Sequence, residues 1–237
     1  MTSSESSSGL TVRGFTPPLK LAEFKLVAFD MDSTLISIEC IDEIADLVGR
    51  KREVAAITEA AMRGEIDDYK ESLRRRVALL AGAPEAALQR VYDERLQLNP
   101  GVETFVRACQ AAGLKTLLIS GGFTFFSERV RRRLGLDFAR ANTLGVAQGR
   151  LTGTLLQRPW GDIVDGAEKR RVLLEVAELM GIEAAQVIAV GDGANDLPMM
   201  KAAGLSIAYH PKPAVAVEAM ISITDGGLDR ALEVLQP

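Results

Sequence analysis

The sequence has little cysteine and little aromatic character, and it lacks the marks of membrane and secreted proteins. Cys40 and Cys109 are its two cysteines among 237 residues. They fit no metal-ligand spacing, so we expect reduced thiols in a cytoplasmic protein. No apolar run approaches the ~20 residues of a membrane span. The N-terminus, MTSSESSSG, has neither the basic start nor the apolar stretch of a signal peptide. These absences predict a cytoplasmic protein without a membrane partner.

Positive charge is also scarce. The 32 Asp and Glu residues outnumber the 28 Lys and Arg residues, and the formal net charge is -4. A nucleic-acid backbone attracts a basic surface, so this balance predicts no nucleic-acid partner. With 47% apolar and 25% charged residues, the chain can bury a real core. Nothing in the sequence indicates an oligomeric state.

Composition and periodicity divide the chain into three parts. Residues 1–20 are rich in Ser and contain Pro17-Pro18, which predicts a flexible tail. Residues 37–96 hold amphipathic stretches at helical spacing and no strand-like run, which predicts a cap of about four helices. Residues 21–36 and 97–237 alternate short apolar strands with helices. This alternation is typical of a doubly wound, mainly parallel α/β sheet, so we predict a Rossmann-like core with an inserted helical cap.

Several local predictions bear on the site. Short apolar runs predict core strands at 24–29, 115–119, 186–190, 205–208 and 221–223. Residues 140–156 resemble a β-hairpin with a turn near Gln148-Gly149. Asn99 before Pro100 predicts a helix N-cap, with Pro100 at the first helical position.

Two carboxylates follow directly after the first predicted core strand. Asp30 and Asp32 stand two residues apart in Asp30-Met31-Asp32-Ser33-Thr34. Ligands of a doubly wound sheet bind beyond the carboxyl ends of its strands, so the pair is expected at the binding edge. One carboxylate can attack phosphorus, and the other can act as a general acid and then a base. Taken alone, the pair fits an acidic loop or a helix cap equally well.

A second acidic cluster follows the strand at 186–190. Its sequence is Gly191-Asp192-Gly193-Ala194-Asn195-Asp196. Oxygen ligands from separate loops suit Mg²⁺, whereas the alternation and terminal Glu of an EF-hand calcium loop are absent. The alternative is a simple turn rich in Gly and Asp.

Polar groups for a phosphate follow the strand at 115–119. Ser120, Gly121 and Gly122 offer a hydroxyl and free backbone N–H groups. Lys169, early in a predicted helix, adds a cation. Each feature alone is weak, because Ser-Gly-Gly is a common turn and a single Lys is usually at the surface. Together with the two acidic clusters they converge on one sheet edge, where clustered carboxylates need a divalent cation and a Lys.

The order Asp30-x-Asp32-x-Thr34, Ser120, Lys169 and Gly191-Asp192-Gly193-x-Asn195-Asp196 resembles the four motifs of the haloacid dehalogenase superfamily. Further strings resemble the phosphoserine phosphatase family within it: Glu39, Ile41-Asp-Glu-Ile44, Ser72-Leu-Arg-Arg-Arg-Val77 and Ser120-Gly-Gly-Phe123. The resemblance covers nearly the whole chain after residue 20.

The resemblance implies a Mg²⁺-dependent hydrolysis of O-phosphoserine, the last step of serine biosynthesis in that family. Asp30 would form an aspartyl-phosphate, and Asp32 would be the general acid and base and lend its backbone carbonyl to Mg²⁺. Asp192 would be a metal ligand with Asp30, and Asp196 would support the metal site. The phosphoryl group would be held by Ser120, Gly121, Gly122 and Lys169, and Asn195 would add a contact to phosphate or substrate.

The amino-acid part of the substrate would contact the cap. Arg76 can hold a carboxylate in bidentate fashion, and Glu39 can hold an ammonium group. The alternative is a surface role for both side chains. Met62 and Tyr69 match positions that shield the substrate and also suit the core of a helical bundle; the family more often has Phe at the position of Tyr69.

Two rival functions stay open at this point. One is action on another small phosphomonoester, or transfer of the phosphoryl group to a second alcohol such as homoserine. The other is a catalytically silent binding protein on the same scaffold, because a fold does not fix a function.

Overall fold

The computed structural model describes residues 8–63, 65–66, 68–157 and 161–236. Its centre is a seven-stranded sheet in the order β1-β10-β9-β8-β3-β4-β5. The strands are β1 (Leu10–Val12), β3 (Leu26–Phe29), β4 (Lys115–Phe123), β5 (Phe138–Asn142), β8 (Val187–Gly191), β9 (Leu205–Tyr209) and β10 (Ile221–Ile223). All neighbouring pairs are parallel except β1 on β10. The predicted α/β fold with a mainly parallel sheet is confirmed.

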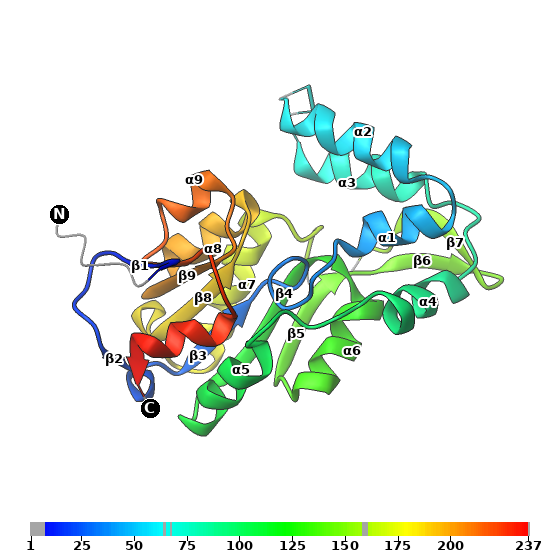
Figure 1. Cartoon of the computed structure of the whole chain (residues 1–237). Helices are drawn as coiled ribbons and strands as arrows, with labels where there is room; N and C mark the ends of the chain where they lie inside the picture. Colours follow the sequence, from blue (N-terminus) through cyan, green and yellow to red (C-terminus); the bar gives the residue numbers. More distant parts are fainter. Residues whose placement is uncertain (1–7, 64, 67, 158–160, 237) are drawn as a thin grey trace.

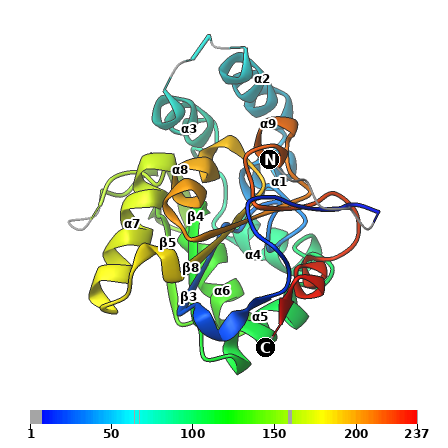
Figure 2. The same ribbon diagram turned by 90° about the vertical axis from the view of Figure 1, so that its left-hand side faces the viewer.

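Helices cover both faces of this sheet, which explains why its central strands β3, β8 and β9 are buried along their whole length and mostly apolar. Val27 and Phe29 belong to one apolar cluster with residues of α5 (Val102–Ala111) and α6 (Thr124–Leu134). Leu26 and Ala28 belong to a second cluster with residues of α7 (Gly166–Leu179), α8 (Leu197–Ala202) and α9 (Pro213–Ala216). Successive side chains of a strand point to opposite faces, so β3 feeds both clusters. Figure 2 shows α7 on one side of the strands and α5 and α6 on the other.

Four of the helices that follow β3, all within residues 37–96, form what we call the cap. They are α1 (Cys40–Leu47), α2 (Lys51–Met62), α3 (Tyr69–Ala78) and α4 (Ala86–Glu94). The hairpin of β6 (Leu144–Ala147) and β7 (Arg150–Leu155) packs beside them (Figure 1), with its turn at Gln148 and Gly149. The Gly82 N–H donates to the Leu151 carbonyl at 2.8 Å, and the Leu151 N–H donates to the Ala83 carbonyl at 2.8 Å. A segment from the second half of the chain therefore supports the cap.

The two ends of the cap insertion lie side by side. The Ser37 N–H donates to the Gln97 carbonyl at 3.0 Å, and Ile36 bridges Leu98 in antiparallel fashion. The apolar cluster on the α5 and α6 face continues through Leu35 and Ile36 into the cap. Cap and core thus share buried apolar surface at the point where the chain crosses between them.

The structure corrects three local predictions. The flexible tail is wrong for Leu10–Val12, which pair with β10, and for β2 (Leu19–Lys20), which pairs with β11 (Leu235–Gln236); residues 1–7 lie outside the described residues. The helix after Asn99 begins at Val102 with Gly101 as its N-cap. Residues 140–142 belong to β5 in the main sheet, and the hairpin begins only at Leu144.

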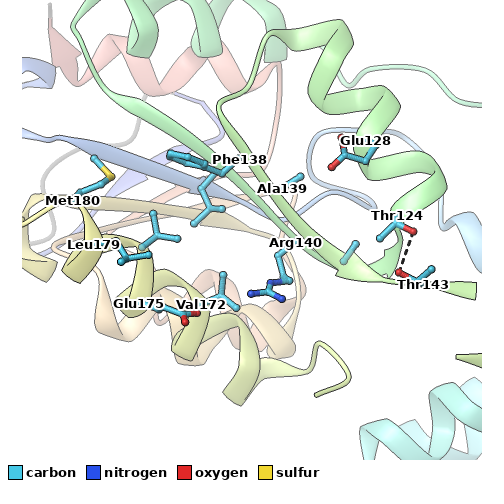
Figure 3. A pocket seen from close by; sticks show the side chains of 13 residues that line it. Thr124, Glu128, Phe138, Ala139, Arg140, Thr143, Val172, Glu175, Leu179 and Met180 are labelled. Atoms are coloured by element: carbon cyan, nitrogen blue, oxygen red, sulfur yellow. Dashed lines mark hydrogen bonds between the residues drawn. The ribbon is translucent and has the colours of Figure 1, made fainter. Parts of the chain in front are cut away.

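A groove of about 570 Å³ lies between α7 and the free edge of the sheet at β5 (Figure 3). Its lining includes Phe138, Arg140, Glu175 and Leu179 and none of the predicted site residues. The predicted chemistry therefore lies elsewhere. Within the described part of the chain, no helix has both the length and the apolar character needed to cross a membrane.

Candidate active site

Three neighbouring strands bring the predicted motifs to one edge of the sheet. In the order β8-β3-β4, Phe29 pairs with Val190 on one side and with Leu118 on the other. Asp30 therefore begins the loop beside the end of β8, and Ser120 lies on the adjacent part of β4. Since parallel strands end at the same edge, this register brings the three motifs together as expected. β4 itself continues through Ser120 and the two glycines to Phe123.

Lys169 is fully buried between two carboxylates. Its Nζ lies 2.5 Å from Asp30 Oδ1 and 2.6 Å from Asp196 Oδ1. Asp165 caps α7 by accepting the Glu168 N–H at 2.8 Å, which fixes the first turn of the helix that carries Lys169. Burial alone would lower the pKa of Lys169, but Asp196 and Asp30 outweigh it and raise the pKa above its usual value. The lysine therefore stays charged inside the protein.

Lys169 does not neutralise the carboxylates around it. Burial and the negative charge of Asp196 raise the pKa of Asp30 well above its usual value, although Lys169 opposes them. Burial and Asp196 also raise the pKa of Asp192, to about 6. Ligating oxygens of these three aspartates lie within 4.8 Å of one another. Three carboxylates thus lie close to a single lysine, and a further cation would stabilise their charged forms.

Asp196 is already occupied by protein donors. One oxygen accepts from Lys169, and the other accepts the backbone N–H groups of Asp192 at 3.1 Å and Gly193 at 3.0 Å. A Cβ on Gly191 would lie 2.5 Å from the Asp196 Cβ, so this loop closes only with glycine at that position. Asp196 therefore shapes the loop, whereas Asp30 and Asp192 each have, among the described contacts, one oxygen without a protein donor.

Asp32 faces the Ser-Gly-Gly segment. A Cβ on Gly122 would lie 2.6 Å from Asp32 Oδ2 and 3.0 Å from Ser120 Oγ, so all three groups meet at one point. Ser120 is fully buried, and its Oγ accepts the Gly122 N–H at 2.8 Å. Burial, followed by the charge of Glu39, raises the pKa of Asp32 to about 7. Near neutral pH this carboxyl group is present in both protonation states.

Tyr69 brings the cap onto the same segment. A Cβ on Gly121 would lie 2.3 Å from Tyr69 Oη, so the phenol at the start of α3 covers the Gly121 backbone. Burial raises the pKa of Tyr69 to about 12, so the hydroxyl stays neutral. The charges of Lys169, Arg76, Asp30 and Asp32 also act on this hydroxyl, as expected for a group at the centre of the site.

The other cap residues predicted to bind the substrate make fewer contacts with the rest of the site. Glu39 is exposed at the start of α1 and accepts a hydrogen bond from Ser33 Oγ at 2.9 Å. Arg76 is half-buried on α3, and its Nε donates to the Ser72 carbonyl at 3.4 Å. Among the described contacts, no ion pair joins Glu39 to Arg76. The side chain of Met62 lies outside the described residues, although its backbone ends α2.

Asn195 lies in the loop of the second acidic cluster, within the short 3-10 helix Ala194–Asp196. A Cβ on Gly193 would lie 2.6 Å from Asn195 Oδ1, so the Asn195 side-chain amide packs against the backbone of the loop that carries Asp192. The side chain is half-buried. Asn195 thus lies beside the carboxylate group, and its contact with phosphate or substrate stays a prediction.

Comparison with known proteins decides the family. The family model of haloacid dehalogenase-like hydrolases matches residues 24–204. The chain belongs to this hydrolase family. It is 65% identical over 229 residues to a phosphoserine phosphatase of Albidiferax ferrireducens, covering 97% of each chain, and 62% identical over 236 residues to that of a Polaromonas species, covering 100% of each.

Solved structures of phosphoserine phosphatases share the fold of this hydrolase. A substrate-bound complex matches with a TM-score of 0.81 at 37% identity, over 90% of this chain and 99% of the other. A structure with an analogue of the phospho-aspartyl intermediate matches with a TM-score of 0.82 at 37% identity over the same shares.

A metal fits the donor set of this hydrolase. Phosphatases of the family are generally metal-dependent, and the acidic cluster of Asp30, Asp192 and Asp196 offers only oxygen ligands. Hard divalent cations prefer oxygen, and the raised pKa values show that these carboxylates lack sufficient positive charge. The residues present therefore suit a divalent cation held by few carboxylates.

Sequence reasoning missed two residues at the site. Asn99 Nδ2 donates to the carbonyls of Ser33 at 3.2 Å, Thr34 at 2.9 Å and Ile36 at 3.1 Å, so its amide holds the loop after Asp32. Lys212 donates its backbone N–H to the Asp192 carbonyl at 3.1 Å, and its charge lowers the pKa of Asp192 against burial. The available signal for Lys212 was its place just after the strand at 205–208, whose carboxyl end reaches the same edge.

Proposed function

We propose that the chain hydrolyses O-phospho-L-serine to L-serine and inorganic phosphate through an aspartyl-phosphate on Asp30. The observation that carries this proposal is the contact of the buried Lys169 with both Asp30 and Asp196, beside Asp192. It supports Asp30 as the nucleophile and Lys169 as a phosphate-binding cation, because the two side chains are in contact at one edge of the sheet. The similarity to phosphoserine phosphatases over the full length supports the choice of substrate.

The first step forms a bond between Asp30 and phosphorus. Lys169 holds Asp30 Oδ1, so the second oxygen is the one that attacks. The bond between phosphorus and the serine oxygen breaks, and Asp32 gives its proton to that oxygen. A pKa of about 7 leaves a useful fraction of Asp32 protonated at neutral pH.

The second step returns the enzyme to its starting state. Asp32, now a carboxylate, takes a proton from a water molecule that attacks phosphorus and releases phosphate from Asp30. Lys169, Ser120 and the backbone N–H groups of Gly121 and Gly122 hold the phosphoryl oxygens through both steps.

The metal in this proposal is Mg²⁺. Asp30, Asp192 and the backbone carbonyl of Asp32 would hold it, and Asp196 would support it through the loop that it shapes. When bound, the ion supplies positive charge that offsets the carboxylates and the phosphate.

Cap residues would recognise the amino-acid part. In the proposal Arg76 binds the substrate carboxylate and Glu39 binds the ammonium group. Tyr69 and Met62 shield the substrate from water, and Asn195 adds a polar contact. The location of Tyr69 over Gly121 supports a cap that covers the bound phosphate.

We also place this reaction in the cytoplasm, as the last step of serine biosynthesis. Cys40 and Cys109 are both buried and unpaired. Free buried thiols are usual in a reducing compartment, which supports this setting.

Phosphate release from O-phospho-L-serine, with and without Mg²⁺, tests the function. We expect turnover that needs the ion and that disappears in Asp30→Asn, with the circular dichroism spectrum unchanged. A panel of phosphomonoesters, with homoserine as a second acceptor, defines the substrate. A clear preference for an ester without an amino-acid head, or transfer to homoserine, would overturn the phosphoserine assignment.

Arg76→Ala tests the recognition of the substrate carboxylate. We expect kcat/KM for phosphoserine to fall about 100-fold or more, because a charge-assisted bidentate contact is lost. The value for p-nitrophenyl phosphate, which has no carboxylate, should change by less than about threefold. Arg75→Ala is the matched control, because Arg75 pairs with Glu71 on the outside of the same helix. Equal losses on both substrates would remove Arg76 from substrate selection.

A further inference from the structure

One lysine of the cap makes ion pairs with the core. Lys70, the second residue of α3, places its Nζ 2.6 Å from Asp162 Oδ2 and 3.4 Å from Asp165 Oδ2. Both aspartates lie in the segment that leads into α7. Figure 2 shows α3 above the start of α7. Among the described residues, these are the ion pairs that join residues 37–96 to the rest of the chain.

Among the described ion pairs of α3, the Lys70–Asp165 pair is less exposed than the Arg75–Glu71 pair. The side chains of Lys70 and Asp165 are 23% and 19% exposed, whereas Arg75 and Glu71 on the same helix are 54% and 43% exposed. Partial burial reduces screening by water and salt, so the Lys70–Asp165 pair is worth more than an ordinary surface pair. Asp162 is 61% exposed, which makes Asp165 the better shielded partner.

Asp165 connects this lysine to the reacting groups. Its Oδ2 faces Lys70, while its Oδ1 accepts the Glu168 N–H at 2.8 Å as the N-cap of α7. The Lys169 N–H donates to the Asp165 carbonyl at 2.8 Å. Lys169 in turn contacts Asp30. A continuous line of contacts therefore runs from the cap to the nucleophile.

Tyr69 links the ion pairs of Lys70 to the phosphate-binding segment. It precedes Lys70 in α3, and its hydroxyl covers Gly121. If the start of α3 moves away from Asp162 and Asp165, Tyr69 must leave the phosphate-binding segment with it. The ion pairs and the phenol are therefore linked through the first turn of α3.

We propose that Lys70 is a positioning residue that holds the cap closed on the core, through Asp162 and Asp165, while substrate is bound. This inference deepens the proposed phosphatase reaction and rests on it for its kinetic test. Lys70 makes no contact with the reacting atoms; it acts through Tyr69 and through the helix that carries Lys169.

Lys70→Met tests the proposal, with Arg75→Met as the matched control on the same helix. We expect kcat/KM of Lys70→Met to fall about three- to tenfold, mainly through KM, for both phosphoserine and p-nitrophenyl phosphate. The cap closes over either substrate, so the loss should not distinguish them, in contrast to Arg76→Ala. The control should stay within twofold of the wild type. An unchanged Lys70→Met would overturn the proposal.

Exchange of the charges separates an ion pair from a simple loss of packing. Lys70→Glu and Asp162→Lys should each lower kcat/KM, and the double variant should recover part of the loss, because the exchanged charges can pair while Asp165 keeps its own negative charge. The gap between wild type and Lys70→Met should also narrow in ~1 M NaCl, where the Debye length is ~3 Å, although partial burial keeps it from closing completely. If the losses in kcat/KM add up in the double variant, and if the difference between wild type and Lys70→Met does not depend on salt, Lys70 does not act through this pair.

Hydrogen exchange follows closure without turnover. In the absence of substrate, amides at the start of α3 and at Ile163 and Val164 should exchange faster in Lys70→Met than in the wild type or in Arg75→Met. If the wild type hydrolyses neither ester but the exchange differs in this way, the proposed function fails and the ion-pair role stands. If the wild type is active and the exchange is identical in all three proteins, the role of Lys70 fails alone.

Discussion

Asp32 lies in surroundings that favour its neutral form. Its pKa of about 7 results first from burial and then from the charge of Glu39, and the Cys40 N–H at 3.4 Å opposes the shift only in part. A carboxyl group with this pKa can give a proton and take one back near neutral pH, which suits its two proposed roles.

Asp32→Asn should make metal-free protein more stable at high pH. The folded pKa is raised above the unfolded value of about 4, so ionisation of Asp32 costs stability as pH rises from about 4 to about 7. The variant lacks this cost. The free energy of unfolding of the variant should therefore exceed that of the wild type by an amount that grows across that window and levels off above pH 7.5. Urea titrations in the presence of a chelator measure this difference. A constant difference across the window would contradict the raised pKa.

Some residue roles are readable from sequence and others are not. Asp30, Ser120 and Asp192 follow apolar runs that predict strands, so their convergence follows from the rule for parallel sheets. The saturated hydrogen bonding of Asp196 and the exposure of Glu39 depend on loop geometry, which no spacing reveals.

At the scale of elements, Asn99 joins the two chain segments that enter and leave the cap. Its side chain donates to three carbonyls of residues 33–36, and its N–H donates to the Leu35 carbonyl at 2.9 Å. The sequence predicted a helix cap here because Asn before Pro is a common start signal. The prediction is wrong because the amide is used by a loop more than 60 residues away in sequence.

Asn99→Leu should loosen this junction. It removes the side-chain donors and leaves the partly buried carbonyls of Ser33, Thr34 and Ile36 without them, which should cost about 1–3 kcal/mol of stability in urea unfolding. Because Asp32 and Glu39 lie on the same loop, kcat/KM should fall for phosphoserine and p-nitrophenyl phosphate alike. Gln89→Leu, on the exposed face of α4, is a control for the loss of an amide. Stability equal to that of the control would show that the three hydrogen bonds matter little.

Strand partners were the part of the fold that periodicity could not assign. Residues 140–142 have the extended pattern expected, but their partner is β4 in the main sheet rather than β6. Leu10 and Val12 alternate with polar residues inside a Ser- and Pro-rich segment, so composition favoured a tail over a strand. Pairing depends on distant residues, which a local pattern does not contain.

At the scale of the whole molecule, β1 covers one edge of the sheet. Leu10 and Val12 are 4% and 5% exposed and pair with Ile223 and Ile221. An antiparallel strand here removes the unpaired edge that β10 would otherwise present to other chains.

The double variant Leu10→Ala and Val12→Ala should lose about 2–5 kcal/mol of stability, because it empties buried apolar volume at that edge. Two strands, β9 and β10, separate β1 from β8, so kcat under stabilising conditions should stay within about twofold of the wild type. Urea unfolding and light scattering provide the measurement, with Thr11→Ala as the control at the same strand. A stable, monodisperse double variant would show that β1 is dispensable.

The cap enters and leaves the core through neighbouring, hydrogen-bonded segments at residues 35–37 and 97–99. An insertion whose ends already touch imposes no spacing on the strands that flank it. We predict that a segment of different length could be grafted in place of residues 38–96 while β3 and β4 keep their register. Substrate range could then change by replacement of this segment, with the phosphoryl-transfer apparatus of the sheet left as it is.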